Sequence, residues 1–160
     1  MKKGGQKKKK TAKGPAKGGH LKAVALPKQH GLVPGTRFIC KIVRQEMGMT
    51  QTEMASLLGV SKKAIQSYEQ RWRSTPVNIE RLALLYLGCL RLSLKGSNLQ
   101  CWKETGCSRE NREKCIAWKL KRGDICWMFT GTYCEGKKEG NWKQKFNMCR
   151  KCPVLTRVFE

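Results

Sequence analysis

Residues 50 to 70 carry the pattern that most narrowly limits the fold of this chain. Thr50 and Glu53 have the spacing of a capping box, in which two side chains satisfy backbone amides at the start of a helix. Gly59 stands where this helix would end, because glycine readily adopts the left-handed conformation that follows many helices. Ser61 is a favourable N-cap for a second helix. The segment therefore predicts two short helices joined by a tight turn.

The second of these helices has two faces. Its apolar residues recur at helical spacing and can face a core, namely Ala64, Ile65 and Tyr68. Its opposite face is polar and is formed by Lys62, Lys63, Gln66 and Ser67. A helix of this kind crossing a first helix is the layout of helix-turn-helix proteins that bind DNA. We expect the polar face to contact bases in the major groove, where lysine suits guanine acceptors and glutamine suits adenine.

Residues 36 to 90 resemble the phage repressor and Cro family of helix-turn-helix proteins, often called Xre-type regulators. The matching residues are Arg44, Gln51, Ala55, Gly59, Val60, Ser61, Ile65, Glu69 and Pro76. The resemblance implies a structural ion pair between Arg44 and Glu69. It also implies that Gln51 and Gln70 contact DNA phosphates. The family usually has glycine after the position of Gln70, whereas this chain has Arg71.

A basic loop follows the second helix. Arg71 and Arg73 in this loop are expected to contact phosphates, which fixes register on the duplex without carrying sequence information. Trp72 between them is interpreted as a packing residue. The chain is therefore expected to be a sequence-specific transcriptional regulator of double-stranded DNA. Regulators of this kind usually bind paired half-sites, so a homodimer is expected as well.

The charge of the chain favours a polyanionic partner. The formal net charge is +23 over 160 residues, and residues 1–35 hold ten lysines and no acid. Residues 1–34 contain too few apolar side chains to offset chain entropy, so they are expected to form a disordered Lys- and Gly-rich arm. No apolar run approaches the roughly 18 to 20 residues that cross a bilayer, and no secretory signal pattern follows the lysines. A cytoplasmic protein without membrane association is expected.

Two further helices complete the predicted bundle. Apolar residues recur at three- and four-residue steps after Thr36 and again, over a longer stretch, from Ile79. The longer helix carries a second apolar set at Leu84, Leu87 and Leu94. This set needs a partner, which would be either a second copy of the chain or the C-terminal segment.

The composition changes sharply after residue 100, because seven of nine cysteines and four of five tryptophans fall within residues 101–152. The remaining cysteines, Cys40 and Cys89, lie in apolar helical settings and are expected to be buried. The segment is too short and polar to fold by apolar burial alone, so a covalent or metal staple is expected. The candidate metal ligands are Cys101, Cys107, Cys115, Cys126, Cys134, Cys149 and Cys152.

Three kinds of staple are conceivable. A reducing cytosol and an odd number of cysteines argue against disulfides. Zinc often uses two Cys-x-x-Cys pairs, whereas only Cys149 and Cys152 form one here. An iron–sulfur cluster tolerates wider spacing, and Cys-x-x-Cys followed by Pro153 is similar to ferredoxin ligation. We expect an iron–sulfur cluster, with zinc as the alternative.

Residues 101 to 156 also resemble the two-CW domain, a small family in which Cys-Trp occurs twice. The matching residues are Cys101-Trp102, Cys107, Cys115, Ala117, Cys126-Trp127, Gly131-Thr132, Cys134, Lys145, Cys149, Cys152 and Val154. The resemblance implies a metal- or redox-linked accessory module. Changes in its metal occupancy or oxidation would then alter DNA binding.

The predicted fold is mainly α, with a repressor-like helix-turn-helix bundle, a small irregular Cys-rich domain stapled by metal, and a disordered basic tail. The predicted boundaries are 1–34 for the arm, 35–94 for the DNA-binding domain, 95–100 for a linker and 101–156 for the Cys-rich domain. No catalytic residues are proposed and an enzyme is not expected, because no nucleophile–base arrangement or phosphate loop is visible. The alternative function is a non-specific nucleic-acid-binding or electron-transfer accessory protein with a structural zinc or cluster site.

Overall fold

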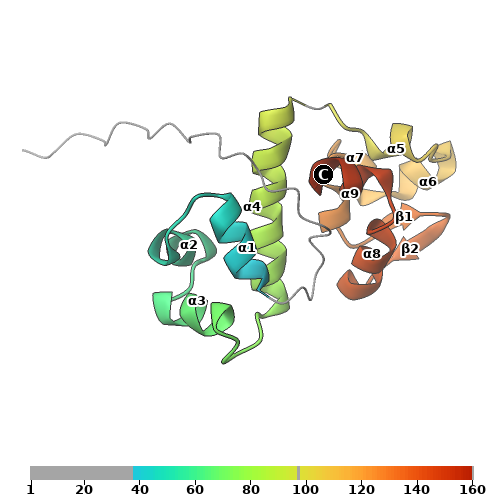
Figure 1. The fold of residues 1–160 in the computed structure, drawn as a ribbon. Helices are drawn as coiled ribbons and strands as arrows, with labels where there is room; N and C mark the ends of the chain where they lie inside the picture. The colour runs from blue at the N-terminus through green and yellow to red at the C-terminus, as the bar shows by residue number, and fades with distance from the viewer. Residues whose placement is uncertain (1–37, 97, 160) are drawn as a thin grey trace, which may run out of the picture.

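The chain folds around one long helix, as the computed structural model of residues 38–96 and 98–159 shows (Figure 1). Three short helices lie on one side of this helix, and the C-terminal segments lie on the other side. The first four helices are α1 (Ile39–Glu46), α2 (Gln51–Leu58), α3 (Lys62–Glu69) and α4 (Val77–Lys95). The arm predicted at residues 1–34 lies outside the described residues.

Helices α1 to α4 share an aliphatic core, because each of them presents apolar side chains at helical spacing. Val43 of α1, Met54 of α2, Ile65 of α3 and Ala83 of α4 have no exposed surface. This arrangement confirms the predicted helical bundle. Helix α1 begins later than expected, at Ile39.

The C-terminal half is built from short segments, the longest of which has eight residues. They are α5 (Cys101–Glu104), α6 (Arg109–Lys114), α7 (Ile116–Lys119), the 3-10 helix η1 (Cys126–Met128), β1 (Thr132–Cys134), β2 (Lys137–Glu139), α8 (Trp142–Cys149) and α9 (Pro153–Phe159). The two strands pair antiparallel, with Thr132 opposite Glu139 and Cys134 opposite Lys137. The described residues are mainly helical, as predicted. No helix among them has the length and apolarity needed to cross a membrane.

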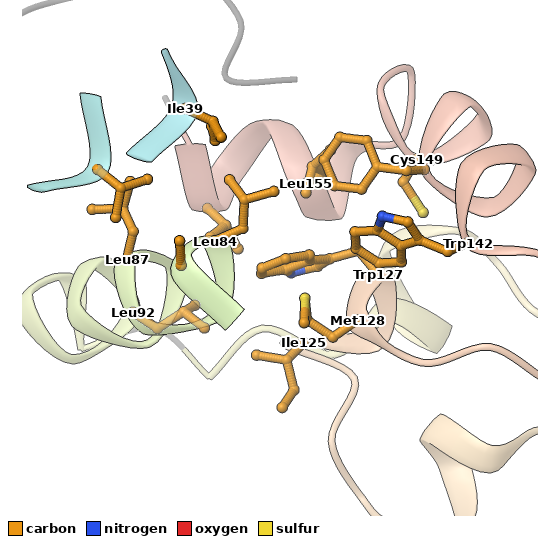
Figure 2. Packing of buried hydrophobic residues seen from close by; sticks show 14 of the residues in the cluster. Ile39, Leu84, Leu87, Leu92, Ile125, Trp127, Met128, Trp142, Cys149 and Leu155 are labelled. Atoms are coloured by element: carbon orange, nitrogen blue, oxygen red, sulfur yellow. The ribbon is translucent and has the colours of Figure 1, made fainter. Parts of the chain in front are cut away.

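Part of the second apolar set of α4 is covered by the C-terminal half of the same chain, at Leu84. Leu84 and Leu87 are fully buried, whereas Leu94 is 63% exposed. Figure 2 shows the ring of Trp127 reaching toward Leu84. A Cβ at Gly88 would lie only 2.7 Å from Cζ2 of Trp127, so α4 and the tryptophan meet without space for a side chain. Helix α4 therefore contributes to the cores of both halves.

Two arginines of α4 add polar links between the halves. Arg81 donates a hydrogen bond from Nη2 to the carbonyl oxygen of Met128 at 2.9 Å, and its guanidinium lies 4.6 Å from the Trp142 ring centroid. Arg91 is buried and donates to the Glu46 carboxylate on α1 and to the Phe159 carbonyl oxygen on α9. One side chain therefore joins elements on opposite sides of α4.

Two details differ from the sequence-based expectations. Cys89 is exposed on α4, so the prediction of a buried side chain is wrong there, whereas Cys40 is buried as expected. Lys95 belongs to α4 and Leu99 is buried, so the linker predicted at residues 95–100 begins inside a helix and contains a core residue.

Candidate functional site

Helices α2 and α3 meet at a turn whose local chemistry follows the sequence. The backbone amide of Glu53 donates to Thr50 Oγ1 at 3.2 Å, and the amide of Thr50 donates to the Glu53 carboxylate at 2.7 Å. Gly59 has a φ of 65°, and the hydroxyl of Ser61 accepts from the Ala64 amide at 3.1 Å. The predicted capping box, helix end and second N-cap are all confirmed.

Glu69 at the end of α3 fixes this helix to the two before it. Arg44 of α1 donates from Nε to one carboxylate oxygen of Glu69 at 2.6 Å and from Nη2 to the other at 3.1 Å. Gln51 of α2 donates to the second oxygen at 2.8 Å. Burial alone would raise the pKa of Glu69, but these hydrogen bonds outweigh it and lower the pKa. The ion pair implied by the resemblance is therefore present.

The eight residues expected to contact DNA lie on or beside α3. Those of α3 and the following loop with exposed side chains are Lys62, Lys63, Gln70, Arg71 and Arg73. Gln66 and Ser67 are half-buried, and the Ser67 hydroxyl donates to the carbonyl oxygen of Lys63 at 2.9 Å. Gln51 is also half-buried and is directed toward Glu69. The structure thus gathers seven of the eight residues on α3 and its loop, with Gln51 beside them.

The loop after α3 has a glycine-like backbone conformation at Arg71, where glycine was expected from the resemblance. Arg71 has a φ of 64°, which is the left-handed conformation that glycine adopts without strain. Its guanidinium lies 4.0 Å from the ring centroid of Phe38, in a cation–π contact. Trp72 next to it is 76% exposed, so its interpretation as a packing residue is wrong. The loop therefore presents an aromatic ring as well as two cations.

The arrangement of α1 to α4 agrees with the comparisons made for this chain. A family model described as helix-turn-helix matches residues 41–85. This segment is a helix-turn-helix domain of the Xre and Cro-like kind. A domain of this kind supports a role in DNA binding and regulation. No curated protein and no solved structure matches the chain.

The half of the chain beyond the helix-turn-helix domain contains a cavity of 590 Å³. All seven cysteines predicted as metal ligands line it. Six of them lie at or next to the end of a helix or strand, and Cys107 lies in the loop between α5 and α6. Trp102 and Trp118 also line the cavity and pack edge to face, with ring centroids 4.8 Å apart. Short elements thus bring together thiols that are up to fifty-one positions apart in the sequence, from Cys101 to Cys152.

Among the described residues that line this cavity, Lys145 is the charged side chain that is fully buried, and sequence reasoning did not single it out as functional. It lies on α8, has no exposed surface, and donates from Nζ to the sulfur of Cys134 at 3.2 Å. Burial alone would lower the pKa of Lys145, but the sulfurs of Cys149, Cys134 and Cys126 outweigh it and raise the pKa. Its position one helical turn before Cys149 was the signal in the sequence.

The thiols themselves differ in acidity. A hydrogen bond between the side chains of Cys101 and Cys126 lowers the pKa of Cys101 and raises that of Cys126. Burial raises the pKa of Cys149 to about 11. Thiolate sulfur is the ligand of zinc staples and of iron–sulfur clusters, so the donor chemistry of the cavity fits either group. Within residues 38–96 and 98–159, no three potential ligands are gathered tightly enough to hold a metal ion as they stand.

Proposed function

We propose that the chain is a sequence-specific transcriptional regulator whose helix α3 reads the major groove of DNA. The observation that carries this proposal is the combination of two features of α3. Its inner side is fixed by the buried Ile65 and by Glu69, and its first turn presents the exposed Lys62 and Lys63. A helix held rigidly from within can place donors at base edges at little entropic cost.

The residues around α3 would hold the backbone of the duplex. Gln70, Arg71 and Arg73 lie at the end of α3 and in the next loop, where their exposed side chains can contact phosphates. Gln51 starts α2, and the positive end of the helix dipole favours an anion there. The net charge of +23 adds attraction that does not depend on sequence.

The regulator would act as a homodimer on paired half-sites, with its cysteine cavity as a metal centre. The seven cysteines that line the cavity would hold an iron–sulfur cluster or zinc. A bound cluster would supply one-electron chemistry, whereas zinc would supply only a cross-link. Trp127 directly follows Cys126 and packs on α4, so this segment connects the cavity wall to the helix-turn-helix domain.

The test begins with selection of bound sequences from a random duplex library, followed by footprinting. We expect a palindromic site with half-sites about 34 Å apart. Lys62→Ala and Lys63→Ala should each weaken binding to that site by about 1–3 kcal/mol and relax specificity at one base pair. Lys119→Ala is the matched control, because this lysine is exposed on α7 in the other half.

A protein that covers any duplex equally and dissociates with added salt would contradict the proposal. That result would favour the non-specific accessory protein instead.

A further inference from the structure

Lys145 occupies a position that lysines rarely take. Its side chain has no exposed surface, although lysine is almost never fully buried without a partner. Lys143, two positions earlier on the same helix, is exposed and shows that α8 does not force burial of its lysines. Burial of an ammonium group is costly unless an anion or strong acceptors surround it. The surroundings of Lys145 should therefore include such a group.

The groups around Lys145 are sulfurs. Its Nζ donates to Cys134 at 3.2 Å, and Cys149 lies one turn further on the same face of α8. Both cysteines line the cavity, as does Lys145 itself. A neutral thiol is a weak hydrogen-bond acceptor and compensates a buried cation poorly. Thiolates that bind a metal carry negative charge, and they would compensate it well.

We propose that Lys145 is the internal counter-cation of an anionic metal–thiolate centre that includes Cys134 and Cys149 as ligands. The proposal rests on the proposed metal centre and specifies its chemical class. Four thiolates around a divalent cation leave an excess negative charge, which a neighbouring ammonium offsets. Lys145 acts on the centre through the sulfurs and is a positioning residue, as are the outer partners of many metal ligands.

The experiment uses Co²⁺ as the probe on the full-length protein, freshly reduced and kept under nitrogen. Titration is followed by the sulfur-to-cobalt charge-transfer absorption, which reports thiolate ligation directly. Lys145→Met removes the charge at nearly constant length, and Lys145→Arg keeps the charge. Lys143→Met is the matched control on α8, and Cys89→Ser is the matched control for Cys134→Ser because Cys89 is exposed on α4.

We expect Lys145→Met to weaken Co²⁺ binding about 10-fold to 100-fold and Lys145→Arg to restore most of it. Lys143→Met and Cys89→Ser should bind as the wild type does, whereas Cys134→Ser should lose charge-transfer intensity.

Three results would overturn the proposal. They are unchanged affinity in Lys145→Met, an equal loss in Lys145→Met and Lys145→Arg, or a wild-type spectrum without sulfur-to-cobalt absorption. The last result needs no variant, so misfolding of the variants leaves the test intact. Binding to the selected DNA site, measured separately, distinguishes failure of this proposal from failure of the proposed regulator.

Discussion

The two halves of the molecule bury different kinds of side chain. The helix-turn-helix half closes over aliphatic side chains such as Val43, Met54 and Ile65, and its buried acid Glu69 is paired. The Cys-rich half closes over Trp127 and Phe146, but it also buries Lys145 next to thiols. Apolar burial and a completed ion pair need nothing from outside the chain. The comparison teaches that the buried charge of Glu69 is compensated by the chain itself, while the buried charge of Lys145 lies next to thiols, a setting suited to a bound group.

The largest expected effect comes from removing Arg91, which pairs with Glu46 on α1 and donates to the Phe159 carbonyl oxygen on α9. Arg91→Met should destabilise the protein by about 3–5 kcal/mol, because Glu46 would remain buried without its cation. Urea unfolding measures this loss. Tryptophan fluorescence reports mainly the Cys-rich half, which has four of the five tryptophans. We expect the wild type to unfold in one transition and the variant in two.

Lys95→Met is the control for this substitution. Lys95 is an exposed residue of α4, and its amine donates to the carbonyl oxygen of Arg157 at 2.8 Å. Its loss should stay within about 0.5 kcal/mol. A similar loss in both variants would show that the buried pair of Arg91 and Glu46 is not the cause of the loss in Arg91→Met.

The second effect is confined to the helix-turn-helix half and depends on pH. The pKa of Glu69 is lowered in the folded state, so its contribution is present above the unfolded carboxyl pKa of about 4.3 and is lost as pH falls. Glu69→Gln should therefore cost about 2 kcal/mol at pH 7 and progressively less below about pH 4. Urea midpoints of both proteins across this range measure the difference.

Glu113→Gln is the matched control for Glu69→Gln, since Glu113 pairs with Arg109 at an exposed site. This control should change stability little at any pH. A pH-independent deficit in Glu69→Gln would mean that the carboxylate charge does not stabilise the fold.

The smallest effect concerns the loop after α3. Arg71→Gly relieves the strain of a left-handed backbone conformation, which costs about 1 kcal/mol in a residue with a side chain. It also loses a cation–π contact that contributes about 0.5 kcal/mol, so a slight gain in stability is expected. The same change should reduce the salt dependence of DNA binding by about one phosphate contact. Thermal unfolding and binding at several salt concentrations measure the two results.

Arg73→Gly removes a similar charge from the same loop without relieving a positive φ, so it should weaken DNA binding and give no gain in stability. If both variants changed stability equally, backbone strain at Arg71 would not be the cause of the gain in Arg71→Gly.

Local patterns predicted the helix-turn-helix half well because its signals are short in range. The capping box of Thr50 and Glu53, the turn at Gly59 and the cap at Ser61 depend on neighbours within a few residues. The position of Trp72 and the exposure of Cys89 could not be predicted, since each depends on which surfaces other elements cover.

The Cys-rich half was harder to predict, because its elements are too short for periodicity to define them. The common cavity of the seven cysteines follows from tertiary packing of these elements. The burial of Lys145 has the same origin, although its spacing from Cys149 is visible in the sequence. Ligand identity stays a prediction, since the arrangement of the thiols alone does not define a metal site.

The close packing of Trp127 on Gly88 has a practical consequence for anyone who wants the DNA-binding part alone. The family match ends at residue 85, inside α4, and a cut there would remove Gly88 and Arg91 from the helix. A fragment extended to Gly96 would keep α4 but leave the strip around Leu84 open to water. Such a fragment would hide this strip by self-association. Dimers measured on it would not identify the dimer of the whole chain, so the oligomeric state should be determined on the whole chain.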